Sequence, residues 1–290
     1  CSSDLRDITI QFQLNEEKQA LLSQELPLFK IVSRRNSEKE AAYYDGSLFK
    51  LFVGNLQEEI DRGEYTKYLC ENGDKLVIYQ NGSYYYFKRN YSKAPIKMSD
   101  EEVIKLAHEY LINNALLPEG FIASDLLGEE LEDDHIPLMK SVGFFRQIQG
   151  YEVWGRSDIE VHVRADGVSA VICIYSDYEF ERNVACLSYE EIQRLDPFKT
   201  GQIVYEMDKI TSDVKSLVLN DVKIMYYDSP VNQPDLTHIQ PIYQFNGTIT
   251  DVDGNATNFY WTIPAIPEEL TVEIWKEQHL SEIPSYAVKQ

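Results

Sequence analysis

SDEEVIKLAHEYLIN, residues 99–113, is the stretch around which we expect the chain to fold. The Ser99 side chain can accept a hydrogen bond from the backbone N–H of Glu102, and the Glu102 carboxylate can reach back to the N–H of Ser99, which forms a capping box. Apolar residues then recur at the spacing of one helical face, namely Val103, Leu106, Ala107, Tyr110 and Leu111. The stretch therefore predicts a helix with one buried side.

The residues after this helix are typical of an antiparallel meander. Residues 142–148 and 151–154 are apolar runs, and residues 159–164 alternate strictly between apolar and polar. Asp166-Gly167 is a tight-turn signal because glycine tolerates a positive φ, and the partner strand is expected over residues 168–175. One face of this meander could be buried against the helix.

Weaker copies of the same unit are expected before and after it. Ser37–Glu40 and Ser188–Glu191 repeat the Ser-x-x-Glu signal, and each precedes an apolar stripe and hairpin signals. The sequence thus predicts an α+β fold of repeated helix plus antiparallel β-meander modules, with helices packed on one face of each sheet. We expect a tether and lead-in over residues 1–25, then modules over 26–95, 96–185 and 186–290, the last with a tail.

Composition and charge limit the classes of function. The chain has 290 residues, 43% of them hydrophobic, so a folded protein with two or three cores is expected. Its 48 acidic and 27 basic residues give a net charge of -21, and no basic stripe is evident, which argues against nucleic acid as a partner. No apolar run approaches the ~20 residues that span a bilayer.

Cys1 is the first residue and a polar stretch follows it. Exported bacterial lipoproteins begin with a lipid-bearing cysteine once the signal peptide is removed, and Cys1-Ser2-Ser3-Asp4 resembles such an end. We therefore expect an extracytoplasmic protein that a lipid on Cys1 anchors to the cell membrane. The alternative is an arbitrary start of the chain that happens to be cysteine.

The remaining cysteines and histidines give no convincing catalytic site. No cysteine pair has the C-x-x-C spacing of zinc or redox sites. Cys173 reads as a small buried hydrophobe, with a disulfide to Cys186 as the alternative. The five histidines are scattered and lack a G-x-S-x-G or H-E-x-x-H motif, so surface or capping roles are expected for them. The sequence predicts no enzyme and no cofactor.

A calcium loop and a β-turn compete as interpretations of residues 251–255. Asp251, Asp253 and Asn255 have the spacing of the first three ligands of such a loop. Ala256 and Thr262 stand where the loop requires glycine and glutamate. A β-turn between two strands is therefore favoured, and no metal is expected.

Two aromatic runs, 84–86 and 259–261, could line a groove for a sugar or a peptide. Successive residues of a strand point to opposite faces, so only alternate members of each run can be exposed. We take Tyr84, Tyr86 and Tyr260 as the candidate binding residues.

Several segments together resemble a group of predicted lipoproteins from Gram-positive bacteria. They are Leu26–Val32, the capped helix from Ser99, Gly150–Gly155, Gln240–Gly247 and Trp261–Ile266. That group is similar to the YycI/YycH regulatory proteins and to PepSY-type modules, which lie outside the membrane, and the resemblance covers most of residues 26–266. YycI/YycH proteins carry an N-terminal transmembrane helix, in place of which this chain would use a lipid on Cys1.

These observations predict an exported, lipid-anchored, non-enzymatic protein that binds or regulates another protein of the cell envelope. They leave the oligomeric state open. The alternatives are a lipoprotein that binds a small ligand or a glycan, and a hydrolase whose site is not recognisable in the sequence.

Overall fold

The computed structural model describes residues 8–32, 55–80, 82–131, 137–155, 158–174, 176–228 and 238–267. Contacts divide the chain into two compact units, and each combines segments that are distant in the sequence. Unit 1 comprises residues 1–30, 180–227 and 238–287, and unit 2 comprises residues 31–179, 228–237 and 288–290. Unit 2 continues across the module boundary predicted at residue 96, and unit 1 continues across the one predicted at residue 186.

The fold is mostly β, so the predicted α+β class is wrong. Strand makes up 57% of the structure and helix 12%. The described residues contain three α-helices, which are α1 (Glu16–Ala20), α4 (Asp100–Asn113) and α5 (Tyr189–Ile192), and a 3₁₀-helix, η3 (Met207–Lys209). Only α4 exceeds five residues. A Ser-x-x-Glu tetrad fixes where a helix begins but not how far it continues, which is why the repeat of helix-covered modules does not form.

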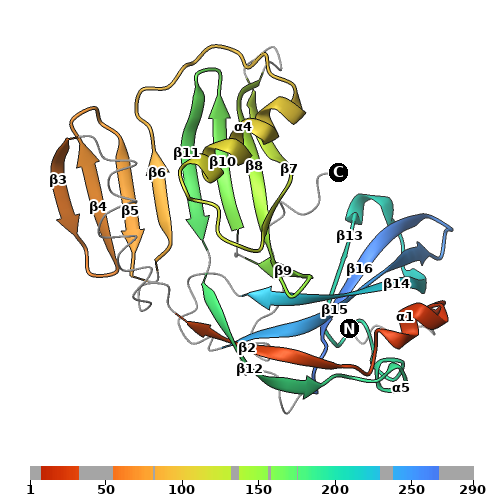
Figure 1. The fold of residues 1–290 in the computed structure, drawn as a ribbon. Coiled ribbons are helices and arrows are strands. Elements are labelled where there is room, and N and C mark those ends of the chain that lie inside the picture. Colours follow the sequence, from red (N-terminus) through yellow and green to blue (C-terminus); the bar gives the residue numbers. More distant parts are fainter. Residues whose placement is uncertain are drawn as a thin grey trace. The chain divides into compact units, whose positions relative to one another are not determined.

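Unit 2 contains one antiparallel sheet (Figure 1). Its strands are β3 (Leu56–Asp61), β4 (Tyr65–Cys70), β5 (Lys75–Tyr79), β6 (Tyr84–Phe87), β7 (Phe121–Leu131), β8 (Pro137–Ile148), β10 (Asp158–Arg164) and β11 (Gly167–Ile174). They lie in the order β7-β8-β10-β11-β6-β5-β4-β3, with every neighbouring pair antiparallel. β9 (Tyr151–Gly155) forms a short hairpin with the end of β8. The meander predicted after the helix is thus only half of this sheet.

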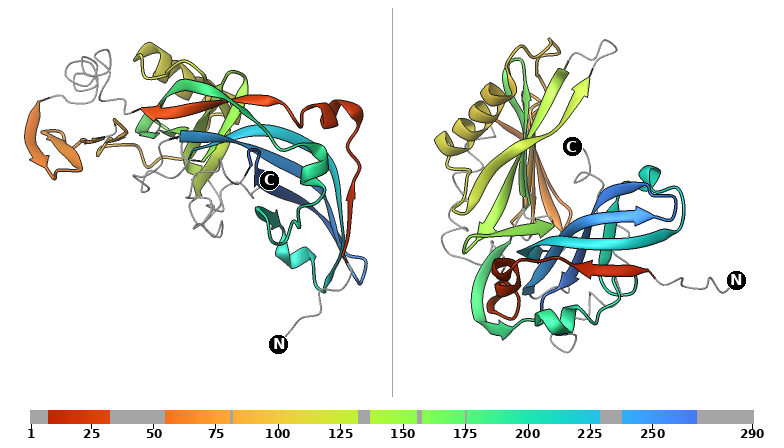
Figure 2. Two further views of the ribbon diagram at one scale, coloured as in Figure 1. Left: turned by 90° about the horizontal axis from the view of Figure 1, so that it is seen from below. Right: turned by 90° about the vertical axis from the view of Figure 1, so that its right-hand side faces the viewer.

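Helix α4 begins as the sequence predicts and covers one face of this sheet (Figure 2). Ser99 Oγ accepts a hydrogen bond from the Glu102 backbone, and Glu102 Oε2 accepts one from the Ser99 backbone at 2.8 Å. Val103, Ala107 and Leu111 are fully buried. They join a core with strand residues that include Leu76, Tyr84, Phe144, Val161 and Cys173.

Unit 1 is organised on three long strands (Figures 1 and 2). They are β14 (Val214–Asp228), β15 (His238–Asp251) and β16 (Ala256–Pro264), and they pair antiparallel in that order. β1 (Thr9–Phe12) extends the sheet beside β14 in parallel, and β13 (Gln202–Tyr205) extends it beside β16. β2 (Glu25–Val32) pairs with the start of β15, and β12 (Asp177–Ala185) follows β2 in the strand order.

One face of the unit 1 sheet carries an aromatic core. Phe245, Phe259 and Trp261 are fully buried there. The ring of Phe12 lies edge-on to Phe245 and to Trp261, with ring centroids 6.2 and 6.4 Å apart. Because side chains alternate along a strand, the residues between these are directed to the opposite face, where the candidate site lies.

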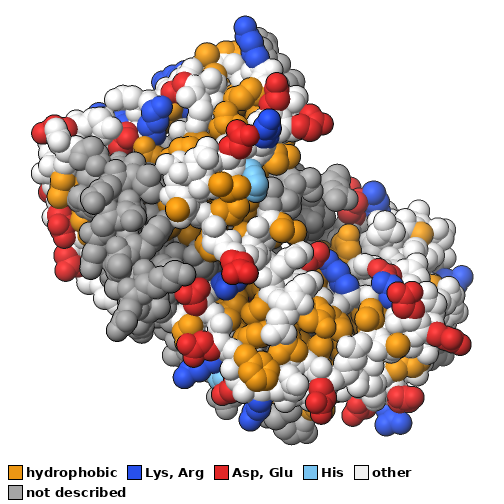
Figure 3. All heavy atoms as spheres, in the orientation of Figure 1, with side chains coloured by type: hydrophobic (Ala, Val, Ile, Leu, Met, Phe, Trp, Pro, Cys, Tyr) orange, Lys and Arg blue, Asp and Glu red, His pale blue; other side chains and the backbone are white. Residues whose placement is uncertain are grey.

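No helix in the described part of the chain is both long and apolar enough to cross a membrane. On the face shown in Figure 3, acidic and basic side chains are intermixed.

Candidate functional site

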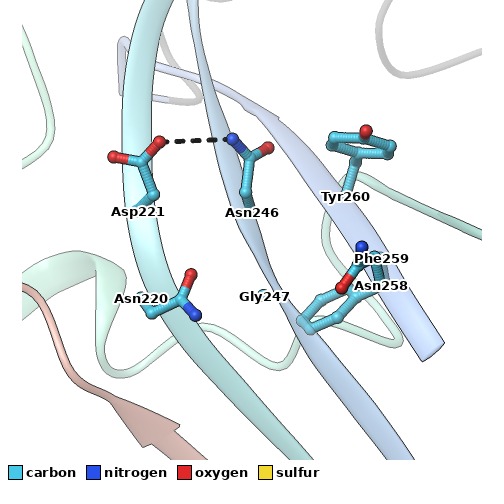
Figure 4. Close-up of a pocket in the computed structure, with 7 residues that line it drawn as sticks. All are labelled: Asn220, Asp221, Asn246, Gly247, Asn258, Phe259 and Tyr260. Carbon is cyan, nitrogen blue, oxygen red and sulfur yellow. Dashed lines mark hydrogen bonds between the residues drawn. The ribbon is translucent and has the colours of Figure 1, made fainter. Parts of the chain in front are cut away.

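Three polar side chains lie in one row across the outer face of β14, β15 and β16 (Figure 4). Asp221 is opposite Asn246, and Asn246 is opposite Tyr260, in the register of the sheet. The pairing of β14 with β15 shifts between Leu219 and Asp221, so Asn220 is the extra residue of a β-bulge. We call Asp221, Asn246 and Tyr260 the polar row.

A shallow pocket lies beside the polar row. Its lining residues are Asn220, Asp221, Asn246, Gly247, Asn258, Phe259 and Tyr260, and its volume is about 300 Å³. Gly247 allows β14 and the Phe259 ring to lie close to β15, because a Cβ at that position would overlap the backbone oxygen of Val218 and come within 2.8 Å of the Phe259 ring. We call this hollow the polar-row pocket.

The charge in this pocket is balanced by a lysine from α1. Lys18 Nζ lies 2.6 Å from Asp221 Oδ1 and also donates to the backbone oxygen of Val222 at 3.4 Å. Burial by itself raises the pKa of Asp221, but hydrogen bonds from Lys18 and its positive charge outweigh burial and hold that pKa below its usual value. Asp221 is therefore ionised at neutral pH, and Lys18 offsets its charge.

Asn246 carries a buried acceptor that has no partner among the described residues. Its Nδ2 donates to Asp221 Oδ2 at 3.4 Å. Since a carboxylate can only accept, the amide nitrogen must face Asp221, which directs Oδ1 away from it, on the side of Tyr260 (Figure 4). Tyr260 itself is 44% exposed, in agreement with its selection from the sequence.

The other two candidate aromatic residues are not on a surface. Tyr84 and Tyr86 are 1% and 8% exposed, and both belong to the core beneath α4. Tyr86 donates its hydroxyl to Asp74 at 3.0 Å, and burial raises the pKa of this phenol. Alternation shows that neighbours in a strand face opposite sides, but it does not show which side is covered.

An aromatic ladder that the sequence analysis missed lies on the opposite face of β4, β5 and β6. Tyr65 contacts Tyr79, with ring centroids 5.6 Å apart, and Tyr79 contacts Tyr85 at 5.3 Å. Phe87 continues the ladder at 6.5 Å from Tyr85. The alternation of residues 84–87 places Tyr85 and Phe87 on one face of the strand. Which other rings they contact depends on the pairing with β4 and β5, which the sequence does not give.

A serine, a glutamate and a histidine meet on β8 and β10. Ser141 is opposite His162, and Glu160 Oε1 accepts hydrogen bonds from Ser141 Oγ and, at 2.8 Å, from His162 Nε2. The bond from His162, together with that from Ser141, lowers the pKa of Glu160 against the opposing effect of burial. In a catalytic triad the imidazole lies between the hydroxyl and the carboxylate. Here the carboxylate lies in the middle, so His162 does not activate Ser141.

The β-turn interpretation of residues 251–255 fits the structure. Asp251 is fully buried, and its carboxylate accepts from the backbone of Asp253, Asn255 and Thr211 at 3.0, 2.8 and 3.2 Å. Gly254 takes a positive φ of 89°. Burial raises the pKa of Asp251, but these bonds and the one from the Asn255 side chain outweigh it and hold the pKa far below its usual value. The oxygens that a calcium ion would need are thus occupied by N–H donors.

In the ranges that the structure describes, no group of three or more His, Cys, Asp or Glu could hold a metal ion. Cys173 and Cys186 are buried and are not joined by a disulfide, so the Cys173–Cys186 alternative is wrong. Burial raises the pKa of the Cys186 thiol to about 11, which keeps it protonated and unreactive.

Cys1 and the helix expected after Ser37 lie outside the described residues. The lipid anchor on Cys1 therefore stays a prediction, and the resemblance to YycI/YycH and PepSY-type proteins also stays a prediction. No protein-family model matches the chain, and no match was found among the curated proteins.

Proposed function

We propose that this chain is a non-enzymatic, lipid-anchored protein outside the cytoplasm, which binds and thereby regulates another protein of the cell envelope. The observation that supports binding best is β7, an 11-residue strand at the edge of the unit 2 sheet. Within the described ranges β7 pairs with β8 alone. The backbone groups along its other side suit the addition of an extended segment from a partner.

The side chains of β7 favour docking at this edge. Ile122, Leu127 and Leu131 are 47%, 38% and 46% exposed. Soluble proteins commonly protect edge strands with charged side chains. The two glutamates of β7 are instead engaged with their own sheet, since Glu129 contacts Lys140 at 3.5 Å and Glu130 contacts Arg164 at 2.6 Å.

The opposite edge of the same sheet differs. In β3 three of six residues are acidic, namely Glu58, Glu59 and Asp61, and most of its residues are exposed, whereas three of the eleven residues of β7 are acidic. A short acidic edge discourages strand addition, so a partner is expected at β7 rather than at β3.

Two further observations support the rest of the proposal. Because Glu160 lies between Ser141 and His162, the imidazole is not placed to take the Ser141 proton, so these residues do not form a Ser–His–acid triad. The resemblance to YycI/YycH proteins supports a regulatory role.

The binding surface can be tested by charge substitution at the two edges. Ile122→Lys and Leu131→Lys on β7 should reduce partner recovery from solubilised membranes about tenfold, a loss of about 1.4 kcal/mol. Leu56→Lys on β3, where the native leucine is 40% exposed, is the matched control and should recover the partner as the wild type does. No partner in any sample, or equal recovery from all variants, would contradict the proposal.

The anchor has its own test. Mass spectrometry of the N-terminal peptide from native membranes should find a diacylated Cys1, because two acyl chains suffice for stable attachment. Cys1→Ser should move the protein from the membrane to the soluble fraction. An unmodified Cys1 in membrane-bound protein would rule out this anchor.

A further inference from the structure

We infer that the polar-row pocket is a second binding site, which takes a neutral, hydroxyl-rich ligand of the carbohydrate class. The pocket lies in unit 1, and β7 lies in unit 2. The inference therefore does not depend on the proposed protein partner.

The polar groups of the pocket match the hydrogen-bonding pattern of vicinal hydroxyls. Asn220 and Asn258 are exposed at its rim, and Asn246 lies between Asp221 and Tyr260. Each amide offers donors and acceptors, while the carboxylate of Asp221 only accepts. A sugar hydroxyl both donates and accepts, so adjacent hydroxyls can pair with this mixed set, whereas a ligand that only accepts or only donates leaves part of it unpaired.

The electrostatics favour a ligand without charge. Lys18 Nζ occupies Asp221 Oδ1 at 2.6 Å, so the single carboxylate of the pocket is already neutralised. A cation would be repelled by Lys18, and an anion would meet the carboxylate. A neutral polar ligand meets neither penalty.

Tyr260 supplies the flat apolar surface that sugar rings require. Its neighbours Phe259 and Trp261 are fully buried, while Tyr260 is 44% exposed beside the amides. The face of an aromatic ring is electron-rich and attracts the partly positive C–H groups of a sugar ring. Polar groups next to one exposed ring therefore provide both kinds of contact that a sugar makes.

Ligand binding would provide a hydrogen-bond partner for the buried side-chain oxygen of Asn246, which favours the bound state. Oδ1 has no hydrogen-bond partner among the described residues, and an unpaired buried acceptor destabilises the ligand-free protein. A ligand hydroxyl that reaches this oxygen would donate a hydrogen bond to it. The bulge at Asn220 places Asp221 opposite Asn246 before the ligand arrives, so the polar row is already formed in the ligand-free protein.

The inference can be tested by NMR titration of the whole chain. Maltotriose, cellotriose and chitotriose are added separately to ¹⁵N-labelled protein, up to about 10 mM, which detects a Kd of about 1 mM. We expect at least one trisaccharide to shift the amides of Asn220, Asn246, Asn258 and Tyr260. No shift at these residues with any of the three, or a larger response to inorganic phosphate, would overturn the inference.

Variants separate stacking from a general change of structure. Tyr260→Ala should weaken binding about tenfold, and Tyr260→Phe, which keeps the ring, should bind nearly as the wild type does. Phe198→Ala is the matched control, because Phe198 is 42% exposed in the same unit but does not line the pocket. Equal affinity of Tyr260→Ala and Phe198→Ala would overturn the inference.

Discussion

At the scale of the residue, Asp251 shows how this acidic chain buries a carboxylate without a cation. The backbone N–H groups of Asp253, Asn255 and Thr211 and the Asn255 side chain surround its two oxygens. Hydrogen bonds from neutral donors to an ionised acceptor are stronger than bonds between neutral groups, so the charge can remain inside. The carboxylate thereby ties the β15–β16 turn to the segment that precedes β14.

Asp251→Asn should lower the thermal midpoint at pH 7, and the difference from wild type should shrink in acid. The folded-state pKa is held below the ordinary value of 3.8, so the stabilisation is present above that pH and is lost as the pH falls through the folded-state pKa. Circular dichroism melts at pH 7 and near pH 3 measure this. Asp253→Asn, on the exposed part of the same turn, is the control and should change the midpoint little. A difference that stays constant with pH would contradict this role.

At the scale of the element, two identical caps begin helices of very different length. The boxes at Ser99 and Ser188 form with the same hydrogen bonds. α4 continues for 14 residues because its apolar stripe has a sheet to cover, whereas α5 stops after four and buries only Ile192. A cap removes the penalty of unpaired N–H groups, but packing of an apolar face supplies most of the stability of a helix.

Substitutions in α4 should separate these two contributions. Ser99→Ala should lower the free energy of unfolding by about 1 kcal/mol. Leu111→Ala should lower the free energy of unfolding by about 2–5 kcal/mol, because Leu111 lies on the fully buried face of the helix. Ile112→Ala is the matched control, since Ile112 is 53% exposed, and urea denaturation measures all three. Similar losses for Leu111→Ala and Ile112→Ala would show that the helix does not pack as described.

At the scale of the whole molecule, neither unit corresponds to a continuous piece of the chain. Unit 1 brings residues 1–30 together with residues that follow Glu179. In unit 2, β6 joins β11, with Phe87 opposite Ala170, so strands before and after α4 share one sheet and one core. Such long-range pairing means that a boundary drawn from local signals can pass through a core.

Fragments of the chain should reveal this organisation. Residues 96–185, the predicted central module, lack β3 to β6 and with them Leu76, Tyr84 and Tyr86 of the core. We expect this fragment to show no cooperative unfolding transition in urea, while residues 31–179 do show one. A cooperative transition of the 96–185 fragment alone would support the three-module division instead.

Local sequence determines some features of this fold, whereas others depend on the pairing of distant strands. The sequence by itself determined the cap at Ser99, the buried stripe of α4 and the turn at Asp251, because each depends on residues close together in the chain. It did not determine the sheet order, the covered face at Tyr84 and Tyr86, or the length of α5, since these depend on which distant strand lies alongside.

The polar row is the clearest case of what only the tertiary structure decided. Asp221, Asn246 and Tyr260 belong to three strands. The aromatic run 259–261 made Tyr260 a candidate, but nothing in the local sequence sets Asp221 and Asn246 apart from other surface residues. Their meeting depends on the register of β14, β15 and β16 and on the bulge at Asn220. A slip of one residue would turn each strand over and send these side chains into the core, so the packing of Phe245, Phe259 and Trp261 on the other face fixes the site.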